Sequence, residues 1–329
     1  MGAIEFIVVA VLIIILILAL YQKSTNAMCK SKKRLDGRTV IVTGGTTGMG
    51  LQIATDFADR GARVIIACPF TNEGDDALQI IKQKTESEKV IFKLLDLSSI
   101  DSVRKFTADI LKNEDRLDIL ANNAGVGAVT EFITDDGMSF IMQVNYFGHV
   151  LLTLLLMPLL KKTGTASDPA RVINTSSCFH YFGTVNFEKL NDIKHYYPLQ
   201  FYANSKVCLV LFSHEITKKL KGANVVVNSV DPGAVGTAIF YCTGSIFGYI
   251  ISSLAYIIFK TPLEGAQTAL HVALDKNAGN ISGGFFKNCE LSSAKQSAYD
   301  DVTAKRLWDE SMRLLKLSDE EIEQCLNKC

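Results

Sequence analysis

From residue 39 onward, short apolar runs alternate with stretches of helical character. The runs are Thr39–Thr43, Arg63–Cys68, Val90–Leu95, Leu117–Ala121, Arg171–Thr175 and Asn224–Val230. The helical stretches are Met49–Arg60, Asp75–Glu86, Ser99–Asn113, Asp136–Lys161 and Phe201–Leu220. Strands that alternate with helices form a parallel sheet with helices on both faces, and wholly apolar runs are typical of strands covered on both sides. We therefore predict an α/β fold with a doubly wound, mostly parallel sheet.

The balance of acidic and basic residues argues against a nucleic-acid partner. The chain has 329 residues with 34 basic and 34 acidic side chains, so its formal net charge is zero. Proteins that bind nucleic acid usually carry an excess of Lys and Arg, and we expect no such partner. The eight cysteines show no paired framework and no metal-ligand spacing, so we expect reduced thiols and no metal site.

A long apolar segment lies at the amino terminus. Residues 3–21 contain a single charged residue, Glu5. As a helix this segment would be roughly 28 Å long, close to the thickness of a bilayer core. A cleaved signal peptide is the alternative, but no Lys or Arg precedes the apolar run and no clean cleavage site follows it. We predict that residues 3–21 form an uncleaved transmembrane anchor.

Basic residues gather on one side of this segment. They are Lys23, Lys30, Lys32, Lys33, Arg34 and Arg38. The positive-inside rule places that side in the cytosol, so we predict a basic linker over residues 22–37 and one cytosolic domain over residues 38–329. The sequon Asn280-Ile281-Ser282 makes the orientation testable, because a glycan at Asn280 would place the domain in the lumen.

A second apolar segment interrupts the pattern near the end of the alternation. No charged residue occurs from Ala234 to Phe259, and residues 239–259 are aromatic and aliphatic. We interpret this segment as a cover over the substrate that dips into the membrane surface. A plain core helix fits the composition equally well.

A glycine-rich turn follows the first apolar run directly. Residues 43–50 read TGGTTGMG and open the next helical stretch. Glycines let the backbone approach a pyrophosphate, and the helix N-terminus supplies amide donors and the positive end of the helix dipole. The strand–turn–helix context favours a dinucleotide site at this turn.

Tyr202 and Lys206 are four residues apart and lie on one face of a predicted helix. An ammonium near a phenol favours the phenolate and lowers the pKa of the tyrosine. A phenol with a lowered pKa can give or take a proton at a carbonyl or alcohol oxygen. The pair alone is equally compatible with a solvated helix face, so its meaning depends on the other motifs.

Three motifs together resemble the short-chain dehydrogenase/reductase family. They are Thr-Gly-x-x-x-Gly-x-Gly at residues 43–50, Asn122-Asn123-Ala124-Gly125, and Tyr-x-x-x-Lys at residues 202–206. Residues 95–99 (LDLSS), 143–149 (QVNYFGH), 171–177 (RVINTSS) and 304–308 (AKRLW) are similar to the retinol dehydrogenase branch, whose members are membrane-anchored. The resemblance covers residues from about 38 to 316 and implies a Rossmann-type sheet of seven strands.

The resemblance implies four catalytic residues. Tyr202 would be the general acid/base, and Lys206 would lower its pKa and bind the nicotinamide ribose. The family's serine bonds the substrate oxygen; its spacing from Arg171 selects Ser177 over Ser176. Asn145 resembles the asparagine that holds a water in a proton relay to the lysine.

The resemblance also implies the residues that hold a nicotinamide dinucleotide. Besides Tyr202 and Lys206, they are Gly44, Thr46, Thr47, Gly48, Met49, Gly50, Asp96, Leu97, Asn123, Ala124, Gly125, Pro232, Gly233, Val235 and Thr237. Asp96 would contact adenine, and the loop after Asp231 would hold the carboxamide.

The second run ends with a departure from the family pattern. Close relatives carry an arginine there that pairs with the 2′-phosphate of NADP, whereas this chain has Pro69, which offers neither charge nor donor. No acidic residue of the kind that accepts from the ribose 2′-hydroxyl of NAD is apparent at this point. The resemblance favours NADP(H) and leaves NAD(H) open.

We predict an oxidoreductase that moves a hydride between NADP(H) and a lipophilic alcohol or carbonyl, with a retinol/retinal-like substrate as the first hypothesis. Steroids, fatty aldehydes and isoprenoids are alternatives, as is a non-catalytic, membrane-bound scaffold that binds the cofactor. The aromatic-rich insert at residues 180–199 is either a wall of an apolar pocket or a surface loop. We expect a single-pass protein of the endoplasmic reticulum membrane. A homodimer through Asp136–Lys161 and Phe201–Leu220 is compatible with the resemblance.

Overall fold

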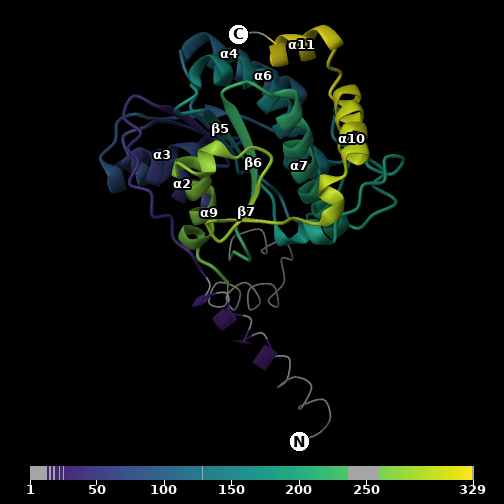
Figure 1. The fold of residues 1–329 in the computed structure, drawn as a ribbon, viewed down its shortest axis with the longest axis horizontal. Helices are drawn as coiled ribbons and strands as arrows, with labels where there is room; N and C mark the ends of the chain where they lie inside the picture. The colour runs from purple at the N-terminus through teal and green to yellow at the C-terminus, as the bar shows by residue number, and fades with distance from the viewer. Residues whose placement is uncertain are drawn as a thin grey trace, which may run out of the picture.

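A parallel sheet with helices on both faces forms the body of the protein (Figure 1). The computed structural model describes residues 13–14, 16–17, 19–21, 23–24, 26–127, 129–235 and 259–327. The strands are β1 (Thr39–Thr43), β2 (Arg63–Cys68), β3 (Val90–Leu94), β4 (Ile119–Asn122), β5 (Ala170–Thr175), β6 (Val225–Asp231), β7 (Phe285–Lys287) and β8 (Glu290–Ser292). The helices are α2 (Gly48–Asp59), α3 (Thr71–Thr85), α4 (Ile100–Asn113), α5 (Phe140–Met142), α6 (Gly148–Thr163), α7 (Pro198–Lys219), α9 (Pro262–Leu274), α10 (Asp301–Leu314) and α11 (Asp319–Asn327).

The sheet confirms the predicted fold class and corrects the number of strands. Among the described residues it has eight strands in the order β3-β2-β1-β4-β5-β6-β7-β8, rather than seven. The first seven are parallel, and β8 pairs antiparallel with β7. The extra strand is an exposed edge of three residues. All three residues of β8 are exposed, so this strand has no apolar run by which the sequence could predict it.

The order β3-β2-β1-β4-β5 reverses direction between β1 and β4. In open parallel sheets, ligands bind beyond the carboxyl ends of the strands at this reversal. Two hydrophobic cores flank the sheet: α2, α3 and α9 contribute to one, and α4, α6, α7, α10 and α11 to the other. The fold therefore places the turn after β1 and the loop after β4 side by side.

Two helix boundaries differ from the predicted ones. The helix expected from Asp75 begins four residues earlier, at Thr71. The helix expected at Asp136–Lys161 begins at Phe140, after a cap by Ser139, and contains a π-helical turn, η1, over Gln143–Phe147. Both changes bring additional side chains to the carboxyl edge of the sheet.

Residues 26–37, which belong to the predicted basic linker, pack against the domain. The Leu35 side chain is buried. The Cys29 amide donates to Gln267 of α9, and the Arg60 guanidinium donates to the carbonyls of Ser31 and Lys33. Lys33, one of the basic residues of this segment, also belongs to the folded surface through its ion pair with Asp168.

The predicted anchor lies mostly outside the described residues. Those of its residues that are described, from 13 to 21, are helical. Within the described part of the chain, Phe140–Thr163 is the one helix long and apolar enough to cross a membrane, and it is mostly buried in the domain. The apolar segment 239–259 is also outside the described residues, except for Phe259.

Candidate active site

The glycine-rich turn connects β1 to α2 and needs its glycines for steric reasons. Gly44 and Gly48 have φ angles of +61° and +53°, in the left-handed region that favours glycine. A Cβ on Gly50 would lie 2.0 Å from the carbonyl oxygen of Gly44. The turn can therefore close tightly enough to present the N-terminus of α2.

The side chains of Thr43 and Asn123 hold the loop after β4 against this turn. Thr43 Oγ accepts from the amides of Asn123 and Ala124 at 2.9 and 3.0 Å. Asn123 Nδ2 donates to the Thr43 carbonyl at 3.0 Å. A side chain on Gly125 would lie 3.2 Å from Asn145 Oδ1 and 3.5 Å from Lys206 Nζ. This loop therefore forms a second wall that runs from the turn to the Tyr-x-x-x-Lys helix.

A cleft of about 430 Å³ lies between the two walls, a size typical of cofactor sites. Its lining includes eleven of the predicted cofactor residues: Gly44, Thr46, Thr47, Gly48, Met49, Gly50, Asp96, Leu97, Asn123, Ala124 and Gly125. A glycine cradle at a helix N-terminus, with backbone amides beside it, fits the pyrophosphate of a dinucleotide. Asp96 Oδ1 accepts from the Ser98 amide and hydroxyl, so part of its carboxylate holds the local turn.

Tyr202 lies on α7, close to the end of β5. Burial raises the pKa of its phenol to about 12, and a hydrogen bond with the Ser177 side chain acts in the opposite direction. The Phe179 ring meets the Tyr202 ring edge-on at 5.7 Å between centroids. The phenol is therefore protonated at neutral pH and has a hydroxyl partner beside it.

Lys206 lies one turn further along α7 and is 4% exposed. Its Nζ donates to the Thr175 carbonyl at 2.9 Å and lies 5.4 Å from the centroid of the Tyr202 ring. Burial lowers the pKa of Lys206 to about 8. The predicted fall in the pKa of Tyr202 does not appear in this arrangement, because burial of the phenol outweighs the influences that favour the phenolate.

The two competing serines have different surroundings. Ser176 Oγ donates to the Lys206 carbonyl at 2.9 Å and is almost fully buried. Ser177 caps the short 3₁₀ helix η2 (Cys178–Tyr181) by accepting from the Phe179 amide at 3.3 Å, and its side chain interacts with Tyr202. Ser176 is thus committed to the backbone of α7, whereas Ser177 lies beside the phenol.

Asn145 occupies the π-helical turn η1 and is fully buried. Its amide accepts from the Val126 amide at 2.8 Å and donates to the Val126 carbonyl at 2.9 Å. Nδ2 also contacts Ser205 Oγ at 3.1 Å. Asn145 therefore joins the loop after β4 to α7, between the cleft and the tyrosine–lysine pair.

His149 connects this turn to β1. Its Nδ1 lies 3.2 Å from the Asn145 carbonyl, and its Nε2 lies 3.0 Å from Thr43 Oγ. Because a carbonyl only accepts, Nδ1 carries the proton and Nε2 accepts from the threonine. Burial lowers the pKa of His149 to about 3, so the ring is neutral at pH 7. Within the described residues, no group of His, Cys, Asp and Glu side chains is arranged to hold a metal.

The predicted carboxamide loop follows β6. The Gly233 amide donates to Asp231 Oδ1 at 2.9 Å, and the Val235 backbone pairs with Lys260 in an isolated β-bridge. A Cβ on Gly265 would touch both Val235 and Met49, which places Val235 beside the glycine-rich turn. Pro232 is described with this loop, and Thr237 lies outside the described residues.

Eleven residues that were not among the predicted cofactor residues also line the cleft. They are Thr43, Ala67, Cys68, Pro69, Phe70, Glu73, Leu95, Ser98, Val126, Phe140 and Val144, of which Pro69 was noted in the sequence for the missing arginine. Glu73 is the charged residue among them. It was not predicted because the helix was expected to begin at Asp75, after Glu73, whereas it begins at Thr71. With the helix start placed at Thr71, Glu73 is an acidic residue in the first turn of the helix that follows β2, and that position could have been used to predict it from the sequence.

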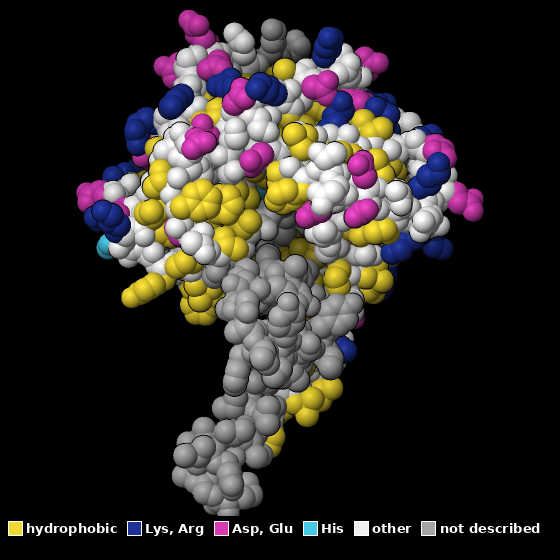
Figure 2. Space-filling model, turned by 180° about the vertical axis from the view of Figure 1, so that it is seen from behind, with side chains coloured by type: hydrophobic (Ala, Val, Ile, Leu, Met, Phe, Trp, Pro, Cys, Tyr) yellow, Lys and Arg dark blue, Asp and Glu magenta, His cyan; other side chains and the backbone are white. Residues whose placement is uncertain are grey.

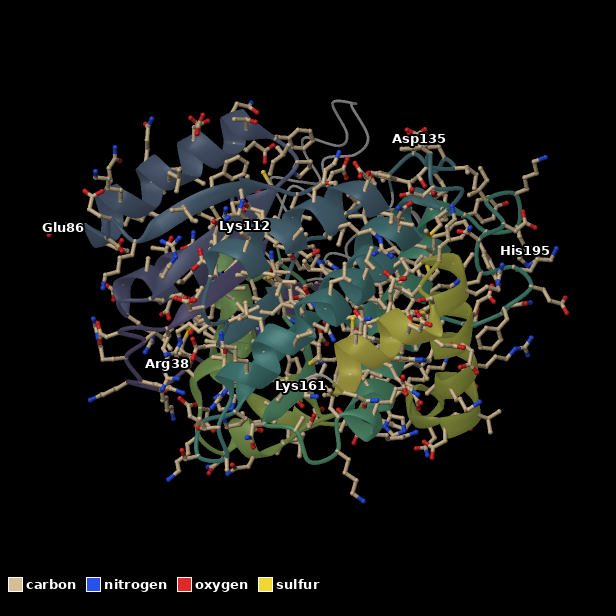
Figure 3. All side chains as sticks on the ribbon, turned by 90° about the horizontal axis from the view of Figure 1, so that it is seen from above. Arg38, Glu86, Lys112, Asp135, Lys161 and His195 are labelled. Carbon is tan, nitrogen blue, oxygen red and sulfur yellow. The ribbon has the colours of Figure 1, made fainter. Side chains whose placement is uncertain are left out.

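The insert before α7 packs against the C-terminal part of the chain. His180 Nδ1 lies 2.6 Å from the Ser177 carbonyl, and its Nε2 accepts from the Lys295 amide at 3.1 Å. Lys295 Nζ donates to the Gly183 carbonyl. Figure 3 places His195 of the insert and Glu86, just after α3, at opposite sides of the molecule. The insert therefore borders the Ser177 end of the site, far from α3.

The chain is similar to known dehydrogenases over most of its length. Residues 38–243 match the short chain dehydrogenase family. Retinol dehydrogenase 13 of Mus musculus is 38% identical over 295 residues, which cover 88% of this chain and 87% of that protein. Retinol dehydrogenase 11 of Mus musculus is 38% identical over 293 residues, or 89% of this chain and 91% of that protein.

Solved structures agree on the fold. An uncharacterised protein from Mycobacterium paratuberculosis has a TM-score of 0.69 at 27% identity, covering 89% of this chain and 97% of its own. A complex of Pseudomonas aeruginosa RhlG with NADP has a TM-score of 0.61 at 25% identity, covering 77% and 95%. On these similarities, the chain belongs to the short-chain dehydrogenase family and is an NAD(P)-dependent oxidoreductase that acts on alcohols.

Proposed function

We propose that this protein transfers a hydride between a nicotinamide cofactor and a lipophilic alcohol or carbonyl, with a retinol/retinal-like compound as the leading substrate. The observation that carries the proposal is the meeting of Tyr202, Ser177 and Lys206 next to Gly125, a residue of the cleft's lining whose Cβ position lies 3.5 Å from Lys206 Nζ. The relatives named retinol dehydrogenases support the choice of substrate class.

Tyr202 handles the proton in the proposed mechanism. In the reducing direction, its hydroxyl donates a proton to the carbonyl oxygen; in the oxidising direction, its phenolate accepts the proton of the alcohol. When bound, the nicotinamide supplies or accepts the hydride. The phenol is protonated at neutral pH, which is the form that donates a proton in the reducing direction. Ser177 donates a second hydrogen bond to the reacting oxygen.

Lys206 and Asn145 support the phenol from the other side. The Lys206 ammonium lies near the Tyr202 ring and favours the phenolate that proton donation leaves behind. Asn145, buried between the cleft and α7, would position a water on the path by which the lysine exchanges protons with solvent. These roles follow from family position together with the contacts described above.

Apolar side chains lead from the surface to Tyr202, which supports a lipophilic substrate. Phe179 contacts both the Tyr202 ring and, at 5.9 Å between centroids, the Phe182 ring, which is 69% exposed. Figure 2 shows hydrophobic side chains gathered on one face, with most charged side chains around it. Steroids, fatty aldehydes and isoprenoids share this chemistry and belong in the same substrate panel.

The cofactor would bind along the cleft, with its pyrophosphate on the glycine-rich turn and its carboxamide at the loop after Asp231. The resemblance favours NADP(H). However, no Lys or Arg of the described chain lines the cleft to pair with a 2′-phosphate.

The proposed setting is a membrane. Residues 3–21 would anchor the chain in the endoplasmic reticulum, and the domain over residues 38–329 would face the cytosol. The apolar length of the segment and the basic residues after it support this arrangement. A substrate dissolved in the bilayer would then reach the site without crossing water.

Replacing Tyr202 by Phe tests the mechanism. We expect kcat for retinal reduction by the full chain in detergent to fall on the order of 100- to 10,000-fold, since the proton donor is lost, while cofactor binding persists. Tyr197→Phe is the matched control, because Tyr197 is 85% exposed and directly precedes α7. Full turnover in Tyr202→Phe would disprove the mechanism. A wild-type protein that binds cofactor but reduces no lipophilic carbonyl would instead favour the non-catalytic scaffold.

A further inference from the structure

The end of β2 forms one end of the cleft and carries no cation. This part of the lining consists of Ala67, Cys68, Pro69, Phe70 and Glu73. In parallel sheets of this type, the residues after the second strand face the adenosine ribose of a bound dinucleotide. Pro69 has neither a charge nor an N–H donor. Glu73 is therefore the charged side chain that this end of the cleft presents.

A hydrogen bond to the glycine-rich turn holds Glu73 in the cleft. Thr46 Oγ donates to Glu73 Oε2 at 3.1 Å. Thr46 is buried, and Glu73 lies in the first turn of α3 and is partly exposed. The bond joins two elements that both line the cleft, and it uses only one of the two carboxylate oxygens. The other oxygen, Oε1, has no hydrogen-bond partner among the described residues.

A carboxylate at this place has opposite effects on the two cofactors. It accepts a hydrogen bond from a ribose 2′-hydroxyl, as an acidic residue about 20 residues past the glycine-rich turn does in NAD-binding folds. It repels a 2′-phosphate, and a cation is needed to offset that repulsion. Within the described chain, the lining contains two carboxylates, Glu73 and Asp96, and no Lys or Arg.

We infer that Glu73 is the residue that sets cofactor choice, and that it makes this protein prefer NAD(H) over NADP(H). The inference rests on the proposed function and reverses the preference that family resemblance implied. Helix stabilisation is the other role open to Glu73, because an acidic side chain in a first turn interacts favourably with the helix dipole. That role alone predicts no effect on the ratio of the two cofactors, so the ratio separates the two roles.

The experiment measures binding to the full chain in detergent by titration calorimetry. NADH and NADPH are compared for the wild type, Glu73→Gln, Glu73→Lys and the control Asp75→Asn, an exposed acidic residue on the same helix. Adenosine 2′-monophosphate and 5′-monophosphate are titrated in parallel, because they isolate the 2′-phosphate from the nicotinamide end. Steady-state kcat/KM with each cofactor gives an independent second measurement.

We expect the wild type to bind NADH at least about tenfold more tightly than NADPH. Glu73→Gln keeps the partner for Thr46 but removes the charge, so it should strengthen NADPH binding on the order of tenfold and change NADH binding little. Glu73→Lys should reverse the preference, and Asp75→Asn should leave the ratio unchanged. The adenosine monophosphates should follow the same order.

Three results would overturn the inference, and the third is distinguishable from the first two. A wild type that prefers NADPH, or a Glu73→Gln variant with an unchanged ratio, removes Glu73 as the determinant but leaves the proposed function intact. Failure to bind either cofactor contradicts both the inference and the proposed function. Melting temperatures of all variants show whether a change in binding reflects a change in folding.

Discussion

At the scale of single residues, burial of the Lys206 ammonium lowers the stability of the folded protein. Its ammonium is buried with one hydrogen bond, to the Thr175 carbonyl, and burial lowers its pKa from 10.5 to about 8. An unfolded chain leaves the same ammonium in water. Folding therefore costs free energy at any pH where the unfolded lysine is charged. A residue kept at this cost fits a functional role better than a structural one.

Lys206→Met should stabilise the protein while it inactivates it. At pH 7 we expect the free energy of unfolding to rise by roughly 2 to 3 kcal/mol. The gain comes from removing a lysine whose pKa falls from 10.5 to about 8 on folding, less the lost hydrogen bond to Thr175. The advantage should be full below pH 8 and disappear as the pH rises to 10.5, because the unfolded lysine then loses its proton too. Urea unfolding of the full chain in detergent at pH 7 and pH 10 measures both values. A variant that is less stable at pH 7 would contradict this account.

At the scale of secondary-structure elements, α10 supports the helix that carries Tyr202. Trp308 of α10 is 5% exposed and stacks on Phe212 of α7, with 6.1 Å between ring centroids. The Lys219 ammonium lies 4.6 Å over the centroid of the same indole ring. The Tyr146 hydroxyl, next to Asn145 in η1, pairs with Ser311 at 2.9 Å. Helix α10 therefore supports α7, which carries Tyr202 and Lys206, and η1, which carries Asn145.

Trp308→Ala should destabilise the domain by about 3 to 5 kcal/mol, since a large aromatic side chain is removed from a packed interface. Val302→Ala is the control, because Val302 lies on the same helix and is 77% exposed. Its effect should stay within about 0.5 kcal/mol. Thermal unfolding of the two full-length variants measures both effects. It is followed by circular dichroism of the backbone, because this signal does not depend on the tryptophan that is removed. Equal effects would mean that α10 does not support α7 in this way.

At the scale of the whole molecule, the C-terminal helices occupy the faces through which a homodimer was expected. α10 packs on α7, and α11 packs on α6. Nearly all of α7 between Phe201 and Ser213 is buried within one chain. A dimer through these two helices would have to displace the chain's own C-terminus, so the homodimer remains a prediction that this packing does not favour.

The orientation of the whole chain can be tested at Asn280, which is exposed on the surface at the short helix η4 (Ala278–Asn280). We expect no glycan there in microsomes, because the positive-inside rule, applied to the basic residues after the predicted anchor, predicts a cytosolic domain. Electrophoretic mobility before and after endoglycosidase treatment is the measurement, with Asn280→Gln as the control. An endoglycosidase-sensitive shift that Asn280→Gln abolishes would place the domain in the lumen.

The sequence by itself determined the fold class, because strands and helices depend on local patterns, and its resemblance to a known family predicted eleven of the residues that line the cleft. Strand runs and helices are set by hydrophobic order along the chain, and the positions in the glycine-rich turn, such as Gly50, follow from backbone contacts within a few residues.

Only the tertiary structure decided what depends on contacts between distant elements. The surroundings of Ser176 and Ser177 differ because α7 lies over β5. Burial raises the pKa of Tyr202 although Lys206 lies nearby, since desolvation depends on everything packed around the phenol. Glu73 reaches the cleft because β2 and α3 bring it to Thr46, 27 residues away in the chain. Such contacts leave no local pattern, so side-chain charge and exposure at this site could be known only after the chain was folded.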